Sequence, residues 1–300
     1  MVVATAHALV LADDAGRTIE FARPPQRIVT LAPSLTELVF AAGGGAAVVG
    51  TDRFSDAPDA ARRIPRVGDA SRLDVERVIG LRPDLVIVWR HGNNLRELGQ
   101  LEAAGIRLFF LEPRRLDDVP RAIERLGVLL GHDSEAKARA ATLRESLEQL
   151  RRAHRDAVPV SVYFQVWSTP LMTINGEQLI NDVIALCGGR NVFAGLAPLV
   201  PVISTESVVA ADPQAMFTAD REEGGGAWLK RDPTHPAFAL WRRQPTLTAV
   251  RRGWLFAING DAISRQGPRI VAGAEAMCSA LDTVRHEARA EKPGSRPGSR

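Results

Sequence analysis

Two glutamates in this 300-residue chain stand at the same position of the same local pattern. Glu76 and Glu206 each lie in the first turn of a predicted short helix, and each is followed seven residues later by a proline and then by a predicted strand. The helix dipole stabilises such a carboxylate by about 0.3–1 kcal/mol, which explains each residue separately. The repetition suggests more, because two matching carboxylates suit a receptor that carries two matching arginines.

No catalytic constellation is recognisable elsewhere. The six histidines are scattered, and the chain lacks the G-x-S-x-G and H-E-x-x-H motifs of hydrolases and zinc proteases. We therefore predict a binding protein, with neither catalytic residues nor a metal site. The alternative from another class is an α/β enzyme acting on a tetrapyrrole substrate, for which Asp56, His91 and Asp261 are the candidate acids or bases.

Composition excludes two classes of partner. The net charge is only +3, and aromatic residues make up 5% of the chain, so neither a basic patch nor a stacking platform for nucleic acid is indicated. The chain lacks an apolar run approaching the ~18 residues that cross a bilayer. We expect a soluble protein with no more than peripheral contact with a membrane complex.

The two cysteines, Cys187 and Cys278, do not have the spacing of a zinc site. From the residues alone they are either two buried free thiols or, in an exported protein, a disulfide.

The elements that position these residues are arranged around one long predicted helix, residues 133–157. Gly131 breaks the chain before it, Asp133 or Ser134 can serve as its N-cap, and Pro159 blocks its continuation. A thin apolar stripe between charged faces indicates that this helix lies across a surface.

Strands and helices alternate on both sides of this helix, and the glutamate pattern occurs once on each side. This predicts an α/β fold of two similar lobes, each with a central sheet flanked by helices. The N-terminal lobe spans residues 1–132, the C-terminal lobe residues 158–287, and a disordered tail residues 288–300.

The first ten residues leave the location of the protein open. They contain small residues suited to an Ala-x-Ala cleavage site, but they lack a positive n-region and a full apolar core. Either the protein is cytoplasmic, or its export signal is missing or truncated in this chain.

Several segments together resemble one family, although each is weak alone. That family comprises the periplasmic or lipid-anchored substrate-binding proteins of ABC importers for cobalamin, haem and ferric siderophores, and the resemblance is closest to its cobalamin binders. It covers about residues 9–285. The segments are Arg27–Glu37, Phe54–Pro58, Val75–Val78 with Arg82–Arg90, Cys187–Phe193 and Ser264–Ile270.

The resemblance implies a periplasmic monomer that captures a small metal chelate, cobalamin as a ligand and not as a cofactor, in a cleft between the lobes. Haem or a ferric siderophore is the alternative ligand. The partner is an ABC permease with its ATPase subunits, to which Glu76 and Glu206 dock. Cys187 and Cys278 match the disulfide of the family, which favours export.

The resemblance also implies a set of ligand-binding residues. Two tryptophans that cobalamin binders have in the cleft are replaced here by Ala70 and Val200. Trp89 and Trp167 can compensate if they are not core residues. The single tyrosine, Tyr163, lies inside a predicted strand and is interpreted as structural, not as an iron ligand. The expected ligand-binding residues are Ser34, Phe54, Trp89, Trp167, Met172, Asp261 and Arg265.

Overall fold

The computed structural model describes residues 9–220 and 228–290, and the chain divides into two compact units. Unit 1 comprises residues 1–145 and 265–268, and unit 2 comprises residues 146–264 and 269–300. The sequence did not predict that a four-residue segment near the C-terminal end of the chain joins unit 1. Residues 1–8, which include most of the segment considered for export, lie outside the described residues.

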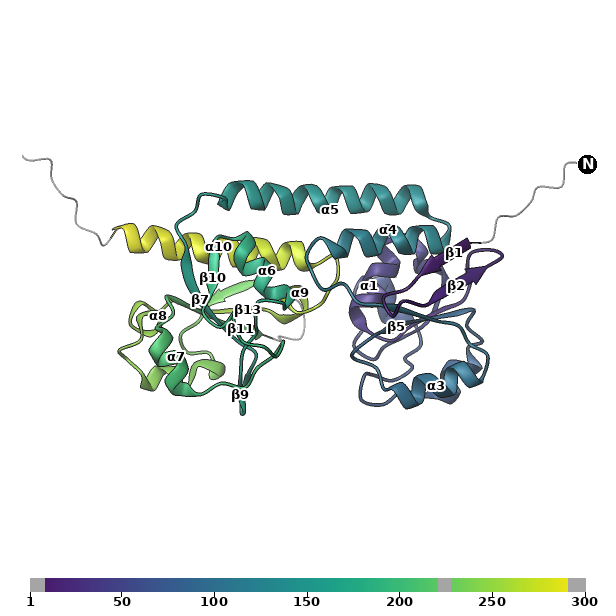
Figure 1. Ribbon diagram of the computed structural model, residues 1–300, viewed down its shortest axis with the longest axis horizontal. Coiled ribbons are helices and arrows are strands. Elements are labelled where there is room, and N and C mark those ends of the chain that lie inside the picture. Colours follow the sequence, from purple (N-terminus) through teal and green to yellow (C-terminus); the bar gives the residue numbers. More distant parts are fainter. Residues whose placement is uncertain (1–8, 221–227, 291–300) are drawn as a thin grey trace, which may run out of the picture. The chain divides into compact units, whose positions relative to one another are not determined.

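Unit 1 contains a four-stranded parallel sheet with the order β4-β3-β5-β6, together with the β1–β2 hairpin (Figure 1). Its elements are β1 (Leu9–Ala12), β2 (Thr18–Phe21), β3 (Ile28–Thr30), α1 (Pro33–Ala41), η1 (Gly44–Ala47), β4 (Val48–Thr51), η2 (Asp59–Arg63), α2 (Val75–Gly80), β5 (Leu85–Trp89), α3 (Leu95–Ala103), β6 (Leu108–Leu111), α4 (Asp118–Leu130) and the first part of α5 (Asp133–His154).

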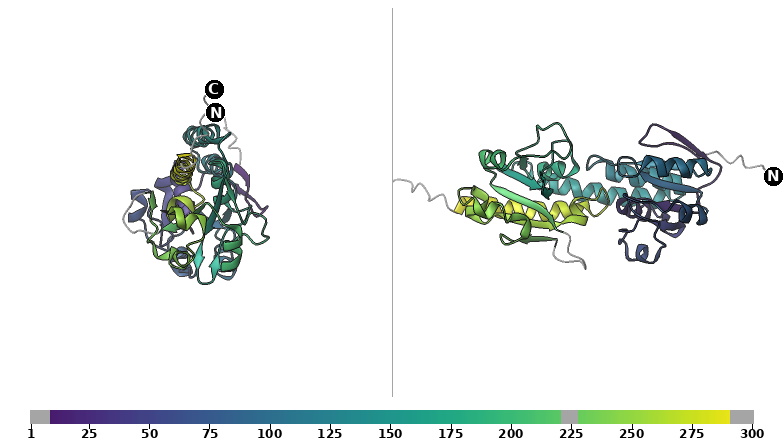
Figure 2. Two further views of the ribbon diagram at one scale, coloured as in Figure 1. Left: turned by 90° about the vertical axis from the view of Figure 1, so that its left-hand side faces the viewer. Right: turned by 90° about the horizontal axis from the view of Figure 1, so that it is seen from below.

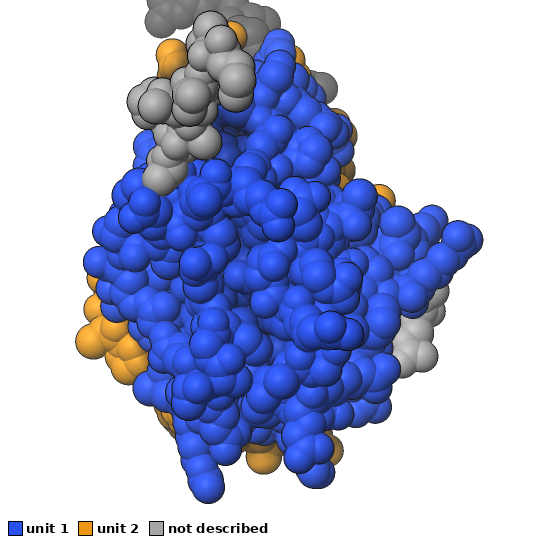
Figure 3. Space-filling model, turned by 90° about the vertical axis from the view of Figure 1, so that its right-hand side faces the viewer, with its two compact units in different colours: residues 1–145, 265–268 blue, residues 146–264, 269–300 orange. Residues whose placement is uncertain are grey.

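The core of unit 1 follows from the apolar composition of these strands. β5 and β6 are almost continuous runs of Leu, Val, Ile and Phe, as expected for parallel strands that are covered on both faces. Val86 and Val88 of β5 pack with Leu98 and Leu101 of α3 in one buried cluster. Figure 3, in which unit 1 is blue, shows one closely packed face of this unit.

Helix α5 passes from unit 1 into unit 2 between Glu145 and Ser146. Ala136, Ala140, Leu143 and Leu147 form its buried stripe, and most of its other residues are exposed. The helix therefore lies across a surface, as predicted. It ends at His154 and not at residue 157, because the His154 Nδ1 atom lies 2.8 Å from the Leu150 carbonyl oxygen and completes the last turn.

Unit 2 contains a five-stranded sheet with the order β10-β7-β11-β13-β12, in which β12 is antiparallel to β13 and the other neighbours are parallel. Its further elements are β7 (Val160–Gln165), β8 (Trp167–Ser168), β9 (Leu171–Met172), α6 (Leu179–Leu186), β10 (Gly189–Asn191), α7 (Thr205–Ala211), β11 (Ala215–Asp220), β12 (Leu229–Arg231), η3 (Pro236–Phe238), η4 (Trp241–Arg243), α8 (Thr248–Arg252), β13 (Leu255–Asn259), α9 (Gly260–Ile263) and α10 (Ile270–Ala290).

Tyr163 lies in the core of unit 2, as the sequence predicted. Its ring makes edge-on contacts with Phe193 and Trp241, whose ring centroids lie 5.8 and 5.6 Å away. It is completely buried, and burial raises the pKa of its hydroxyl well above its usual range. Such a side chain is a structural residue.

Helix α10 packs against α6 and against the sheet of unit 2 (Figures 1 and 2). It continues to Ala290, so the expectation that a disordered tail begins at residue 288 is wrong for residues 288–290. Ala288, Arg289 and Ala290 are good helix formers and extend the last turn. Residues 291–300 lie outside the described residues. Among the described helices, none combines the length and apolarity required to span a bilayer.

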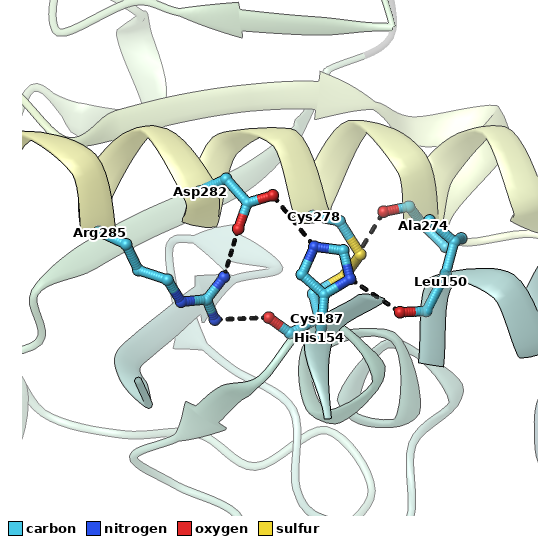
Figure 4. The surroundings of a disulfide bond; sticks show 7 residues. All are labelled: Leu150, His154, Cys187, Ala274, Cys278, Asp282 and Arg285. Carbon is cyan, nitrogen blue, oxygen red and sulfur yellow. Dashed lines mark hydrogen bonds and ion pairs between the residues drawn. A yellow bond between two sulfur atoms is a disulfide. The ribbon is translucent and has the colours of Figure 1, made fainter. Parts of the chain in front are cut away.

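The predicted pairing of Cys187 with Cys278 is confirmed, and this disulfide joins the end of α6 to α10 (Figure 4). Both cysteines are buried. Beside them, the Arg285 guanidinium donates to the Cys187 carbonyl oxygen at 2.6 Å and to Asp282 at 2.7 Å, and His154 lies 3.0 Å from the other oxygen of Asp282. The end of α5 and the end of α6 are thus held on the same stretch of α10.

We expect the double substitution Cys187→Ser and Cys278→Ser to lower the free energy of unfolding of unit 2 by about 2–5 kcal/mol, because the bond closes a long loop in the unfolded chain. The two cysteines are separated by 91 residues. Urea unfolding followed by circular dichroism measures the change. A reducing agent should shift the wild-type midpoint and leave that of the variant unchanged, whereas equal midpoints for both proteins would contradict the prediction.

Candidate ligand-binding and docking residues

Ser34 and Phe54 follow two neighbouring parallel strands of unit 1. Ser34 is the second residue of α1, directly beyond β3, and it is mostly buried. Phe54 lies in the loop beyond β4, where 56% of its surface is exposed. Because parallel strands end at the same edge of a sheet, both residues belong to the edge at which open α/β sheets bind ligands.

The loop that carries Phe54 is anchored on both sides of the ring. The Phe54 backbone N–H donates to Asp52 Oδ1 at 2.7 Å, and Ser55 Oγ lies 2.8 Å from Thr36 Oγ1 in the buried start of α1. Arg53 donates its backbone N–H to the Gly68 carbonyl oxygen at 2.6 Å. These bonds fix the backbone, so the exposed ring is presented on a rigid support.

Asp52 is an anchor that the sequence did not identify. It is 3% exposed, and burial raises the pKa of its carboxyl from 3.8 to about 6, although the hydrogen bond from Phe54 opposes this rise. The only signal in the sequence was a carboxylate placed directly after an apolar strand.

Arg265 reaches unit 1 through the segment formed by residues 265–268. Its guanidinium lies 2.6 Å from Asp56 Oδ1 and 3.2 Å from Glu37 Oε1, and it is 3.4 Å from the Phe54 carbonyl oxygen. The Glu37 side chain is almost completely buried. Arg265 therefore supports the Phe54 loop and has its charge balanced by two carboxylates, neither of which was predicted as its partner.

Trp89, the last residue of β5, is only partly exposed. Its ring packs so closely on Gly92 that a Cβ atom at that position would lie 1.8 Å from the ring. Its buried Nε1 atom has no hydrogen-bond partner among the described residues. His91 lies two residues after Trp89, and its Nδ1 atom is 2.5 Å from Glu112 Oε2.

In unit 2, Trp167 and Met172 lie opposite each other in the β8–β9 hairpin that follows β7. Trp167 is 62% exposed and is therefore not a core residue. Asp261 lies in the short helix α9 beyond β13, and its carboxylate is 3.9 Å from Arg269. These residues occupy the carboxyl edge of the second sheet.

The two repeated glutamates occupy equivalent positions in α2 and α7. Each is the second residue of its helix and is exposed. The helices are capped by Asp74, which accepts from the Arg77 N–H at 2.9 Å, and by Ser204, which accepts from the Ser207 N–H at 3.2 Å.

The same repeat extends to a turn that the sequence did not reveal. Arg82 and Asp212, the residues before the two prolines, have φ angles of +46° and +36°, which are unusual for residues other than glycine. Different partners hold the two turns. The Arg82 carbonyl oxygen accepts from Arg27 Nε at 3.2 Å, and Asp212 Oδ1 accepts from the Thr248 N–H at 2.7 Å.

The carboxylate of Glu206 is held at the start of its own helix. Hydrogen bonds from its own backbone N–H and from the Ser204 hydroxyl hold the pKa of Glu206 below its usual range. Glu206 is thus an anion turned towards the start of its own helix.

Among the residues that the structure describes, His, Cys, Asp and Glu side chains do not form a group that could hold a metal ion.

Residues 28–252 match the family model described as "Periplasmic binding protein". A vitamin B12-binding protein of Photorhabdus laumondii is 32% identical over 258 residues, covering 86% of this chain and 88% of the relative. A second, from Pectobacterium atrosepticum, is 32% identical over 262 residues with the same coverage.

Solved structures extend this similarity to the fold. The periplasmic vitamin B12 binding protein BtuF of Vibrio cholerae has a TM-score of 0.76 and 30% identity, covering 87% of this chain and 98% of that one. The periplasmic haem-binding protein RhuT of Roseiflexus sp. RS-1 has a TM-score of 0.73 and 26% identity, with 86% and 98% covered.

Replacement of the buried carboxyl by an amide tests the role of Asp52. Because its pKa is raised to about 6, the folded chain binds this proton more tightly than the unfolded chain, and stability is lost as the pH rises from about 4 through 6. We expect Asp52→Asn, which keeps an acceptor for the Phe54 N–H, to raise the free energy of unfolding at pH 8 by on the order of 1–3 kcal/mol and to change it little at pH 4.

Thermal unfolding between pH 4 and 8 measures this effect. Asp59→Asn is the matched control, since the Asp59 side chain is 99% exposed. A gain in stability that is the same at every pH, or that Asp59→Asn reproduces, would contradict the assignment of Asp52 as a buried acid.

Proposed function

Because this chain belongs to the periplasmic binding protein family, we propose that it is the component of an ABC importer that captures a corrinoid, with cobalamin as its ligand. The chain is a solute-binding protein and not an enzyme. The observation that carries the proposal is its likeness, over more than four-fifths of its length, to proteins named for vitamin B12 binding.

The described residues of each unit support a binding role in the same way. Exposed or partly exposed aromatic rings can cover the apolar faces of a macrocycle, and a few polar groups can satisfy its amide rim. Unit 1 contributes Ser34, Phe54, Trp89 and Arg265 to the proposed set, and unit 2 contributes Trp167, Met172 and Asp261.

The family functions with a membrane permease and its ATPase. We propose that Glu76 and Glu206 are the residues that dock this chain, as a monomer in the periplasm, onto arginines of the permease. Both carboxylates are exposed at helix starts, and neither belongs to the proposed ligand set, which supports separate docking and binding surfaces.

Haem is the second candidate ligand, since haem-binding proteins share this fold at 26–28% identity. Tyr163, a residue type that can bind iron, is buried in the core and does not support this alternative.

Titration of the purified protein by isothermal calorimetry distinguishes the candidate ligands. We expect cyanocobalamin to bind with one site per chain, and haemin and a ferric hydroxamate to bind at least about tenfold more weakly, a difference of about 1.4 kcal/mol. Preferential binding of haemin or of the hydroxamate would show that cobalamin is not the ligand, but it would leave the proposed role in an importer unchanged.

Charge reversal tests the docking role. We expect Glu76→Lys combined with Glu206→Lys to abolish uptake in proteoliposomes that contain the permease, because each lysine would face a cation, while the dissociation constant for cyanocobalamin changes less than about twofold. Glu20→Lys, at an exposed position of β2, is the control and should support uptake. A parallel loss of affinity and uptake would show that the two glutamates do not act in docking.

A further inference from the structure

Two pairs of neighbouring arginines, each beside a tryptophan, lie close together in unit 2. One pair follows Trp241 in η4, and the other ends α8, two residues before Trp254. Both tryptophans are buried, and each indole N–H donates to a side-chain oxygen, at 2.5 and 2.6 Å. The backbone beside each pair is therefore firmly anchored. We call the four residues the arginine patch, and they are Arg242, Arg243, Arg251 and Arg252.

The fold brings the two pairs onto neighbouring turns. The Leu247 N–H donates to the Gln244 carbonyl oxygen at 3.1 Å, so a tight turn joins η4 to α8. Arg242 Nη1 donates to the Pro233 carbonyl oxygen at 3.2 Å. The Pro233 ring lies beside Gly253, where a Cβ atom would be 3.7 Å from Pro233 Cγ. The first pair thus contacts the same loop as the end of the helix that carries the second.

The arginine patch concentrates positive charge. Residues 228–259 contain six Lys or Arg residues and one Asp, a larger local excess than the net charge of +3 of the whole chain. For this reason the overall composition does not reveal it. Arg242, Arg243 and Arg251 are exposed, and none of them forms an ion pair with a carboxylate among the residues that the structure describes. Their charges can therefore act on an external anion.

The cations are spread over the patch and do not converge on one point. Arg242 is held by two carbonyl oxygens of residues 233–235, at 3.2 and 3.1 Å, whereas Arg251 is held by the Thr246 carbonyl oxygen at 3.5 Å. A single small anion is bound by donors that converge on it. Spread cations instead match a surface that carries many phosphates. Leu240, exposed directly before the first pair, adds an apolar side chain that can enter the edge of a lipid layer.

The arginine patch adjoins the helix that carries Glu206. Asp212, at the end of α7, accepts from the Thr248 N–H at 2.7 Å and from its hydroxyl at 2.8 Å, which ties α7 to the start of α8 (Figure 1). A permease is embedded in a bilayer, so lipid headgroups surround the place where Glu206 is proposed to dock. The patch is therefore near that contact.

We propose that the arginine patch binds the phosphates of anionic phospholipids and holds the chain on the membrane surface beside its permease. The guanidinium group is planar and presents paired donors that match phosphate oxygens. This inference rests on the proposed function, because the permease brings the chain to a membrane, and it adds a second partner to that function. A reversible contact of this kind raises the concentration of the chain at the surface and speeds its encounter with the permease.

Cosedimentation of the full chain with lipid vesicles tests the contact. Wild-type protein binds vesicles of equal parts phosphatidylglycerol and phosphatidylcholine, does not bind vesicles of phosphatidylcholine alone, and is released by salt. Arg243→Gln combined with Arg251→Gln lowers the partition coefficient by about twentyfold, because each cation near an anionic surface contributes about fivefold. The corresponding double substitution to lysine stays within about threefold of the wild type, since it keeps both charges.

The matched control removes two exposed arginines from other elements of unit 2. Arg155→Gln combined with Arg190→Gln changes the net charge by the same amount and leaves the partition coefficient within about twofold of the wild type. Circular dichroism and the thermal midpoint confirm that each variant is folded. Equal losses in this control and in the patch variant, or wild-type protein that ignores anionic vesicles, overturn the inference.

Two further arms separate the lipid from other anions. Sodium phosphate releases the protein no better than sodium chloride at the same ionic strength, and stronger release by phosphate shows a site for a small anion instead. In proteoliposomes that contain the permease, Arg243→Gln with Arg251→Gln slows uptake by about threefold or more when the lipid is anionic and not when it is phosphatidylcholine alone. Slower uptake in both lipids shows that the patch contacts the permease itself and overturns the lipid assignment.

The outcomes distinguish this inference from the proposed function. The wild-type chain binds cyanocobalamin and supports uptake, and the patch variant binds cyanocobalamin as tightly as the wild type. A wild-type chain that does both but does not bind anionic vesicles overturns the inference alone. A wild-type chain that binds these vesicles but neither binds cyanocobalamin nor supports uptake overturns the proposed function and keeps the lipid contact.

Discussion

Strand direction is the constraint on which the two units depend. Neighbouring strands of the central sheets run parallel, apart from the β12–β13 pair, so their carboxyl ends meet along one edge of each sheet. Helix starts and loops gather at that edge, and polar or aromatic side chains can be exposed there without disturbing the apolar strands. Phe54 follows β4, Trp89 ends β5 and Trp167 follows β7, and each of these strands is largely buried.

Both units support their exposed aromatic rings with buried polar groups. In unit 1, Asp52 and Ser55 hold the backbone on either side of Phe54, and in unit 2 Gln165 holds the start of the hairpin that carries Trp167. Buried polar groups of this kind are tolerated when they are hydrogen-bonded, and they fix a loop more specifically than apolar packing does. Rigid support reduces the entropy that binding costs, which suits a protein whose task is capture and not chemistry.

The two segments that carry Glu76 and Glu206 share their backbone geometry more than the side chains that surround it. Both helices are capped, both turn at a residue with positive φ, and both lead into a central strand. The residues that hold the turns differ, since Arg27 serves Arg82 in one unit and Asp212 bonds to Thr248 in the other. Conservation of this geometry within one chain, despite different local partners, is consistent with a shared requirement placed on the two carboxylates.

The sequence by itself determined the features that depend on local pattern. The apolar strands, the charged helix α5, and the equivalence of Glu76 with Glu206 follow from periodicity, composition and spacing, which act between near neighbours. Family resemblance added the disulfide. Only the tertiary structure decided that Asp52 is a buried acid, that Arg265 is balanced by Glu37 and Asp56, and that the arginines of η4 and α8 lie together beside α7. Those facts depend on burial and on contacts between distant segments, which residue order does not specify.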